Sequence, residues 1–267
     1  MTKPSWQDFA THDESAHPDL WNGVVGYWAP CLGPTGTRLH DVSRGNNWGT
    51  LTNMDPATDW VIQGGASALN LTATDFIDCG NPTALNFVAP FAVAAWVKLG
   101  SQPVDTGIVS KTTQADGFSG WVLLQNGSVA NAYWAGGTRA TGTTSIVGDV
   151  LQLIGMSWTG QTAEVWVNGK LDGTGSTTIT PSAAASPIRI GNYATNSNLD
   201  RTARGQYFDA IAWNRRLSPN EWSQLYQLGP GGMLQRRSRR RAYSFVPPAV
   251  NIPILTARNS IIGGGTI

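Results

Sequence analysis

The sequence is poor in charge, and above all in glutamate. Charged residues make up 13% of the 267 residues, the formal net charge is +1, and Glu occurs only at Glu14, Glu164 and Glu221. Exposed helix faces are usually built from Glu, Lys, Leu and Ala, which argues against a mainly helical fold. The chain is instead rich in glycine (31) and tryptophan (12). Strands and tight turns favour such residues, so the composition predicts an all-β protein.

Cysteine and histidine are scarce too. Cys31 and Cys79 are too few for a disulfide framework, and they form either one bridge or, as we favour, two buried thiols. The three histidines, His12, His17 and His40, all lie near the N-terminus. No Cys/His cluster has the spacing of a zinc site, so we expect no zinc.

Long apolar stretches are missing. No run of 18 apolar residues exists, so we expect no membrane-spanning helix and no membrane partner. The first 19 residues contain no apolar core of the kind that signal peptides carry. We therefore expect a protein made in the host cytoplasm that reaches the outside by another route, such as assembly into a particle released by lysis.

What the sequence does contain is a series of short apolar segments separated by turn residues. Roughly a dozen segments of about four to eight residues are bounded by Gly, Asn, Asp or Pro. Residues 91–100 form the longest and predict a central strand buried on both faces. Asn168-Gly169 is a strong signal for a two-residue hairpin, with Val165 and Val167 on one face. This density of strands predicts a two-sheet antiparallel sandwich or barrel.

One short helix is predicted after the last strand. Ser218 is a typical N-cap, Pro219 suits the first helical position and Glu221 completes a capping box. Apolar residues follow at i, i+3 and i+4 and form a single stripe. The sequence Gly-Pro-Gly-Gly at 229–232 ends the helix.

Both ends of the chain differ in composition from its middle. Residues 1–21 are polar, with two prolines and several acids, and predict an extended arm or a peripheral strand. Residues 229–267 carry five arginines within 236–241 and then an apolar stretch interrupted by prolines, which argue against a helix or a central strand. We therefore divide the chain into an N-terminal arm (1–21), a sandwich domain (22–228) and a basic, proline-containing C-terminal arm (229–267).

Several segments, taken in order, match a known fold family. They are GVVGYWAP at 23–30, the polar turn 41–51, ALNLTATDFIDCGN at 68–81, FAVAAWVK at 91–98, the Val-Asn-Gly-Lys hairpin and the closing segment 208–221. Together they resemble the concanavalin A-like jelly rolls of the laminin-G and pentraxin type over about residues 22–228. The resemblance implies an antiparallel jelly-roll sandwich with one short C-terminal helix. It implies little about function, since these sandwiches host lectins, glycosidases, adhesion modules and virion proteins.

The C-terminal arm departs from that pattern. A domain of this kind followed by a short arginine-rich and proline-rich tail resembles proteins found in bacteriophage genomes. The function that this implies is a structural virion protein of a tailed phage, in the first place a capsid decoration or cement protein. Capsid or other virion proteins would then be its partners, in a homo-oligomeric or multi-copy assembly. The residues expected to anchor it are Arg236, Arg237, Arg239, Arg240, Arg241, Tyr243, Phe245, Ile252, Ile254 and Leu255.

The arginine cluster also suits nucleic acid. Encapsidated DNA is out of reach of a protein on the outside of a shell, so we favour docking to protein over nucleic acid. The alternative to a decoration protein is a carbohydrate-binding host-recognition module on a tail or surface, with glycans as ligands.

Catalytic motifs are missing. Glycosidases of this fold resemble one another in a Glu-x-Asp-x-x-Glu strand, and hydrolysis needs two carboxylates on one face. None of the three glutamates stands at that spacing from a suitable acid. No Gly-x-Ser-x-Gly, His-Glu-x-x-His or P-loop motif occurs either. We therefore expect no enzymatic activity, and a glycoside hydrolase with acids from distant segments is the third and least favoured interpretation.

Calcium is the one metal that the resemblance suggests, because related domains often hold Ca²⁺ on a sandwich rim through oxygen ligands. Two polar turns offer such oxygens. The alternative, which we favour, is ordinary turn chemistry, in which Asn and Asp side chains cap their own backbone. The candidate ligands are Asp41, Asn46, Asn196, Asn198 and Asp200.

Carbohydrate binding would need aromatic rings exposed on one face or rim. Trp96, Trp158, Trp166 and Trp213 lie in alternating segments and are expected in the core or on a sheet face. Rings beside loops are better placed to stack on a sugar. The candidates are Tyr133, Trp134 and Tyr193.

Overall fold

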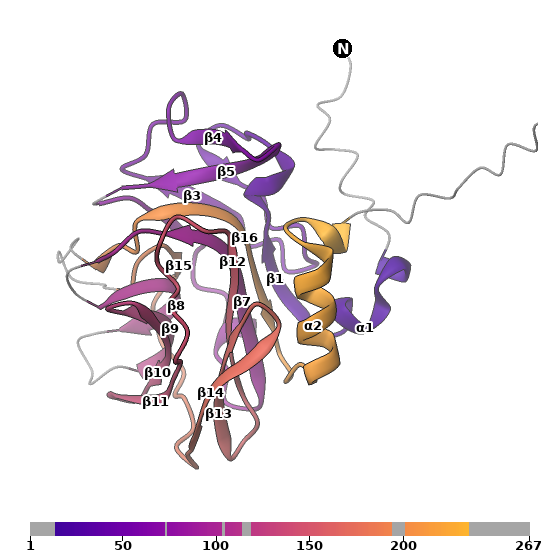
Figure 1. The fold of residues 1–267 in the computed structure, drawn as a ribbon, viewed down its shortest axis with the longest axis vertical. Coiled ribbons are helices and arrows are strands. Elements are labelled where there is room, and N and C mark those ends of the chain that lie inside the picture. The colour runs from indigo at the N-terminus through magenta and orange to yellow at the C-terminus, as the bar shows by residue number, and fades with distance from the viewer. Residues whose placement is uncertain (1–13, 73, 103–104, 114–118, 194–200, 235–267) are drawn as a thin grey trace, which may run out of the picture. The chain divides into compact units, whose positions relative to one another are not determined.

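The structure is a computed structural model and describes residues 14–72, 74–102, 105–113, 119–193 and 201–234. The strands form two antiparallel sheets that pack face to face (Figure 1). Sheet A has the order β14-β13-β12-β7-β16-β5-β4, with β1 also paired to β16. Sheet B has the order β11-β10-β9-β8-β15-β6-β3-β2. The predicted two-sheet antiparallel sandwich is confirmed.

The elements of sheet A are β1 (Val24–Trp28), β4 (Trp60–Gln63), β5 (Ala66–Leu71), β7 (Phe91–Leu99), β12 (Gln152–Trp158), β13 (Thr162–Val167), β14 (Lys170–Ser176) and β16 (Gly205–Trp213). Those of sheet B are β2 (Arg38–Leu39), β3 (Gly49–Thr52), β6 (Phe76–Asp78), β8 (Thr106–Thr113), β9 (Ser119–Asn126), β10 (Val129–Trp134), β11 (Gly137–Thr141) and β15 (Ile188–Ile190). The α-helices are α1 (Pro18–Trp21) and α2 (Pro219–Leu228).

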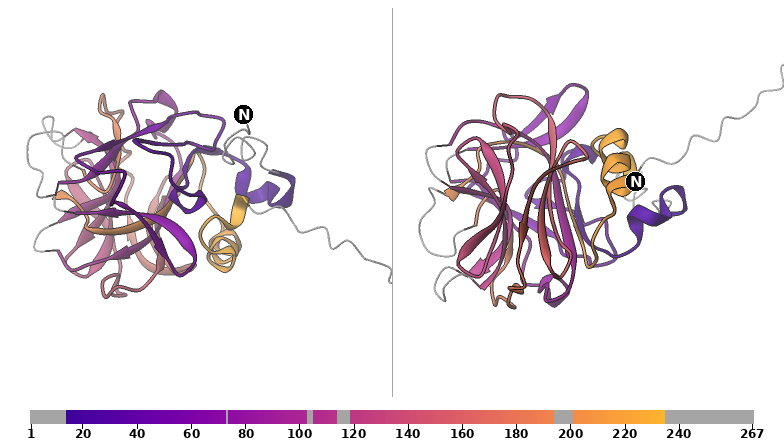
Figure 2. Two further views of the ribbon diagram at one scale, coloured as in Figure 1. Left: turned by 90° about the horizontal axis from the view of Figure 1, so that it is seen from above. Right: turned by 60° about the horizontal axis from the view of Figure 1, so that its bottom comes forward.

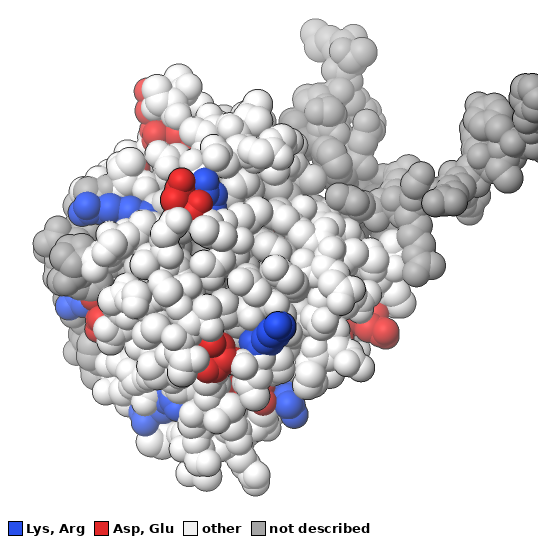
Figure 3. Space-filling view, in the orientation of Figure 1, with Lys and Arg blue, Asp and Glu red and all other residues white. Residues whose placement is uncertain are grey.

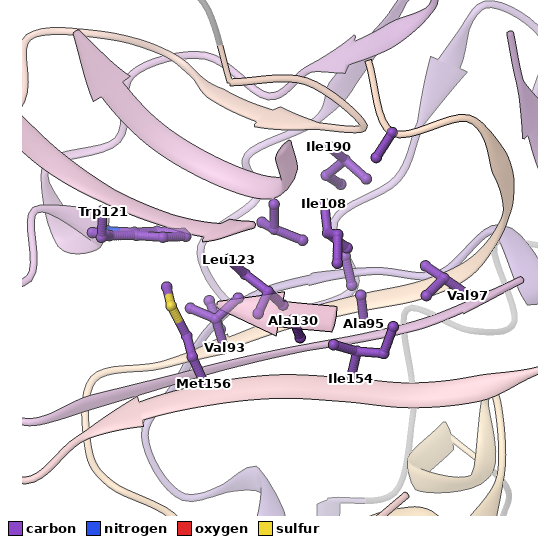
Figure 4. Packing of buried hydrophobic residues seen from close by; sticks show 14 of the residues in the cluster. Val93, Ala95, Val97, Ile108, Trp121, Leu123, Ala130, Ile154, Met156 and Ile190 are labelled. Carbon is purple, nitrogen blue, oxygen red and sulfur yellow. The ribbon is translucent and has the colours of Figure 1, made fainter. Parts of the chain in front are cut away.

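The main core lies between the two sheets. Strand β7 runs through the middle of sheet A, and all nine of its residues are buried, which confirms the predicted central strand. Figure 4 shows Val93 and Ile154 of sheet A facing Ile108 and Leu123 of sheet B across this core. Because side chains alternate along a strand, the other half of each strand's residues points away from this core.

A second core covers the outward face of sheet A. Helices α1 and α2 both lie on this side of the sandwich (Figures 1 and 2). The Trp222 ring of α2 stacks on Trp166 with 5.3 Å between centroids. Gly155 makes this approach feasible, because a Cβ at that position would lie 2.3 Å from the Trp222 ring. The outward face of sheet A is thus an apolar, buried layer.

The predicted hairpin and helix are both confirmed. Asn168 and Gly169 take the positive φ angles of +51° and +75° that a tight hairpin turn requires. At the start of α2, the Ser218 hydroxyl accepts from the Glu221 amide, and the Glu221 carboxylate accepts from the Ser218 amide at 2.7 Å. The apolar stripe is buried except at Tyr226, which remains 42% exposed.

The predicted arms are shorter than the sequence suggested. Residues 14–21 pack against the second core, where Leu20 is fully buried. Residues 229–234 do the same through Met233 and Leu234. Burial of these large apolar side chains outweighs the polar and glycine-rich character of their neighbours. The sandwich unit therefore includes both segments, and the domain limits of 22 and 228 are too narrow.

Neither a disulfide nor a membrane-spanning helix is found among the described residues. Both cysteines there are free thiols, Cys79 buried and Cys31 partly so. No helix in the described part is long and apolar enough to cross a membrane. Charged side chains are also sparse on the face shown in Figure 3.

Candidate functional site

The outward face of sheet B differs from that of sheet A because a continuous row of mostly polar residues crosses it. Residues paired directly opposite one another in antiparallel strands point to the same side of the sheet. The inward neighbours of this row, such as Leu39, Ile77 and Leu123, belong to the main core, so the row itself faces outward. From one edge strand to the other the row is Arg38, Thr50, Asp78, Arg189, Ser110, Val122, Tyr133 and Thr138.

Arginines on this face lie over aromatic rings. The Arg38 Cζ is 5.5 Å from the centroid of the Trp48 ring, beside β2. The Arg189 Cζ is 4.5 Å from the centroid of Phe76, on the neighbouring strand β6. Burial lowers the pKa of the Arg189 guanidinium, and nearby Asp78 raises it. The guanidinium stays cationic, because arginine is the most basic side chain and is not deprotonated in proteins.

The segment that follows β15 folds back over β8. The Gly191 amide donates to the Ile108 carbonyl at 2.9 Å, and the Ser110 hydroxyl donates to the Asn192 carbonyl at 2.7 Å. The returning chain is held by the Ala203 amide, which donates to the Gly191 carbonyl at 2.8 Å. These bonds place residues 191–193 and 201–203 on the outward face of sheet B.

Tyr193 reaches the sheet through this segment. A Cβ on Gly107 would lie 2.6 Å from the Tyr193 Cβ, so only glycine at that position lets the tyrosine approach. The Tyr193 ring packs on Val122 and Leu124, and the Arg201 Cζ lies 5.4 Å from its centroid. Burial raises the pKa of Tyr193, and the Arg201 guanidinium lowers it.

Two of the three predicted sugar-binding rings come together here. Tyr133 is partly exposed and joins the cluster of Tyr193, Val122 and Leu124. Trp134 is not part of it: the ring is fully buried in the main core, and its Nε1 donates to the Ile179 carbonyl at 2.7 Å. The expectation that Trp134 contacts a ligand is therefore corrected. Its place next to Tyr133 in a strand already puts it on the opposite face.

A buried polar atom lies beside the tyrosines. Asn131 is two residues before Tyr133 on β10, so both point outward, and Asn131 is only 2% exposed. Its Oδ1 has no hydrogen-bond partner among the described residues. Buried amide oxygens are usually paired, so this acceptor still needs a donor that the described residues do not supply.

Comparison with known proteins identifies the family to which this chain belongs. A family model described as the concanavalin A-like lectin/glucanases superfamily matches residues 71–221, more than half of the chain. The chain belongs to this superfamily. A comparison with curated proteins found no match.

Solved structures similar to this superfamily member include enzymes and binding domains. A Trypanosoma rangeli sialidase shares 16% identity at a TM-score of 0.57, over 76% of this chain and 32% of the sialidase. The binding domain of Paraclostridial Mosquitocidal Protein 1 shares 14% at 0.60, over 78% and 52%. The binding domain of botulinum neurotoxin serotype G shares 16% at 0.53, over 77% and 51%. The chain spans about a third to a half of these structures, and at such identities they establish the fold alone.

Asp41 and Asn46, two of the predicted calcium ligands, organise a turn of this lectin/glucanase-type sandwich. The Asp41 carboxylate accepts from the backbone amides of Tyr27, Ser43 and Asn47 at 2.8–2.9 Å. The Asn46 Oδ1 accepts from the Trp48 Nε1. A carboxylate surrounded by amide donors favours the turn chemistry over cation binding at this position. Among the described residues, no group of three or more His, Cys, Asp or Glu could hold a metal.

Other predicted site residues lie outside the described part of the chain, so their predictions stand untested. They are the calcium candidates Asn196, Asn198 and Asp200 and the anchoring candidates Arg236, Arg237, Arg239, Arg240, Arg241, Tyr243, Phe245, Ile252, Ile254 and Leu255.

The start of the C-terminal arm is held by a buried carboxylate that sequence reasoning missed. Asp209 accepts from the Gly231 amide at 2.5 Å, the Cys31 thiol at 2.7 Å and the Tyr27 hydroxyl at 3.2 Å. Burial raises the pKa of Asp209 to about 7, while these hydrogen bonds lower it. The Trp21 Nε1 also donates to a carbonyl in this segment. No local pattern marks Asp209, because its partners are distant in sequence.

Proposed function

We propose that the chain is a non-catalytic, carbohydrate-binding module, and that the outward face of sheet B is its binding surface. The observation that carries this proposal is the outward cluster on β9 and β10. There a partly exposed tyrosine, Tyr133, lies beside the unpartnered and buried Oδ1 of Asn131. An aromatic face and a fixed acceptor are the two elements with which proteins bind a sugar ring and its hydroxyls.

The family and the structural neighbours support binding as the general role. The superfamily is described by its lectins and glucanases, and two similar structures are binding domains of bacterial toxins. Those names belong to the neighbours, and their ligands are not carried over. Sheet B contributes the only outward sheet face in the described part that no α-helix covers.

The acidic residues support a non-catalytic role. The outward row contains one carboxylate, Asp78, whereas glycoside hydrolysis by this route needs two. Glu164, on the sheet A side, accepts from Ser157 at 2.5 Å and from Arg216 at 3.2 Å. Asp209 is buried at the start of the arm. We therefore propose that these carboxylates serve structure.

We further propose that the module is an anchored subunit of a multi-copy assembly, of which a phage virion decorated on its surface is the form we favour. This proposal is supported by the positions of the start of the C-terminal arm and the candidate binding surface on opposite sides of the sandwich. The start of the C-terminal arm, at Met233 and Leu234, is packed on the sheet A side, opposite the outward face of sheet B. An arm bound to a shell from the sheet A side would leave sheet B facing outward, toward a host surface.

Glycan-array binding by the full chain tests the binding role. Tyr133→Ala and Asn131→Leu should each reduce binding at least about tenfold, since each removes one of the two contacts. Tyr226→Ala is the matched control, because Tyr226 is another tyrosine at the surface but stacks on Trp96 on the sheet A side. Equal losses in the control and in Tyr133→Ala would contradict the assigned surface, and no binding to any glycan would contradict the role itself.

Removal of residues 235–267 tests the anchor. The cut is placed after Leu234, because Leu234 and Met233 belong to the second core. The shortened chain should remain folded and keep its glycan binding, but no longer join an assembly with its partner proteins. Full incorporation of the shortened chain into particles would refute the anchoring role.

A further inference from the structure

On the outward face of sheet B, arginine side chains lie over aromatic rings. All three arginine–ring contacts within the described residues lie on it, at Arg38, Arg189 and Arg201. The two arginines of the sheet A side at the start of α2 are held differently. There Arg215 pairs with Glu221 at 2.6 Å and Arg216 with Glu164 at 3.2 Å. Carboxylates thus neutralise these two arginines on sheet A, whereas Arg38, Arg189 and Arg201 on sheet B each lie on a ring, and Asp78 is a further neighbour of Arg189.

A guanidinium laid on a ring is prepared for an anion. The ring restricts the rotamers of the group, while its N–H donors remain able to form hydrogen bonds in the plane of the guanidinium. A carboxylate or sulfate matches this planar fork with two parallel hydrogen bonds. Arg201 also donates from Nη1 to the Asp105 carbonyl at 3.2 Å, which holds it further without neutralising its charge.

The spacing suits an extended ligand. Arg189 and Arg38 stand on β15 and β2, three strand steps apart in sheet B. At about 4.8 Å a step, this separates them by roughly 14 Å. Arg201 precedes the bridge between Thr202 and Gly107, on the far side of β15 from β2. A single monosaccharide is too short to reach all three arginines.

We propose that this face binds an acidic polysaccharide, with carboxylates or sulfates of successive sugar units on Arg38, Arg189 and Arg201. This inference rests on the proposed carbohydrate-binding function and names its ligand class. Tyr133 and Asn131 would contact a sugar ring and a hydroxyl at one end of the row, and the arginines would select for charge. An arginine covers one face of each of the rings Phe76, Trp48 and Tyr193. These rings are therefore poorly placed to stack on successive nucleobases, and we favour a polysaccharide over single-stranded nucleic acid.

The basic C-terminal arm would bind polyanions by itself, so the test must remove that contribution. The background is the full chain with Arg236, Arg237, Arg239, Arg240 and Arg241 all changed to Gln. In this background the probes are polygalacturonate for carboxylates, heparin for sulfates, dextran as a neutral polysaccharide and a 20-nucleotide oligo-dT for nucleic acid. Affinity is measured by titration calorimetry at two salt concentrations.

The expected result is binding of polygalacturonate or heparin that weakens with salt. Arg38→Gln combined with Arg201→Gln should reduce that affinity at least about tenfold, the loss of charge-assisted hydrogen bonds. Arg44→Gln is the matched control: it removes one exposed charge, which pairs with Glu14 away from this face. It should change the affinity less than twofold.

Each other outcome has a definite meaning. Equal binding of dextran and the acidic probes would overturn the selection for charge while the carbohydrate-binding function stands. Tighter binding of oligo-dT than of either acidic polysaccharide would overturn the ligand class. If the unmodified chain binds an acidic probe but the chain with the five arm arginines changed to Gln does not, the polyanion contact lies in the arm and the inference is overturned. No binding to any polysaccharide, dextran included, would remove the proposed function together with this inference.

Discussion

The outward faces of the two sheets show how one fold separates stability from recognition. On sheet A the outward residues are large and apolar, and α1, α2 and residues 229–234 bury them. On sheet B the outward residues form a mostly polar row with aromatic and arginine side chains, and among the described residues a short segment, 191–193 with 201–203, crosses them. The same alternation of side chains builds a second core on one sheet and, on the other, a face that no described α-helix covers.

The largest expected effect tests whether the covered face provides stability. Trp222→Ala removes a fully buried ring and leaves a cavity against Trp166, so the free energy of unfolding should fall by about 3–5 kcal/mol. Tyr133→Ala, on the other face, should change it by less than about 1 kcal/mol. Urea denaturation of both variants measures the difference. Similar losses would mean that sheet B is as much a packing face as sheet A.

The second test concerns where the domain ends. A chain that stops at Leu228 loses the buried Met233 and Leu234 and should be less stable by about 3 kcal/mol than a chain that stops at Leu234. The chain that stops at Leu234 should match the full-length protein within about 0.5 kcal/mol. Thermal and urea unfolding compare the three chains. If both shortened chains are equally stable, residues 229–234 belong to the arm after all.

The third test uses the buried carboxylate of the covered face. The pKa of Asp209 is about 7 in the folded protein, above its ordinary value of 3.8, so the folded state binds the proton more tightly. Its contribution to stability is therefore complete below about pH 4, falls by up to about 1.4 kcal/mol per pH unit as the pH rises toward 7, and is constant above that.

Asp209→Asn removes the ionisation and should flatten this part of the pH profile. Urea denaturation of the full chain between pH 4 and pH 8 measures the slope for both proteins. Asp55→Asn, at an exposed carboxylate, serves as the control and should keep the parent slope. A parent protein whose stability rises from pH 4 to pH 7 would mean that other groups dominate.

The fold could be predicted from the sequence because its signals are local. The hairpin at Asn168-Gly169, the capping box at Ser218 and the apolar run of β7 each depend on residues close together in the chain. The extent of the domain was missed for the opposite reason. Leu20 and Leu234 are buried by contacts with segments far away in sequence, and the stretches around them are otherwise polar or glycine-rich.

The candidate site could be predicted only in part. Tyr133 and Tyr193 both adjoin loops in the sequence, and the structure brings them together, whereas Trp134 also adjoins a loop but lies in the core. Strand alternation distinguishes Tyr133 from Trp134, but only once the inward face of β10 is known. The row of arginines was not predictable, because strand order joins Arg38 to Arg189 across 151 positions of sequence.

The smallest expected effect tests whether helix α2, which covers sheet A, influences ligand binding on sheet B. Ser218→Ala removes the hydroxyl that accepts from the Glu221 amide and should lower the free energy of unfolding by about 1 kcal/mol. Ser101→Ala, at an exposed serine, should change it by less than about 0.5 kcal/mol. Because α2 lies on the sheet A side, the affinity of the Ser218→Ala variant for glycans should stay within twofold of the parent. A larger loss would show that the two faces are coupled through the sandwich and that the helix supports recognition as well as stability.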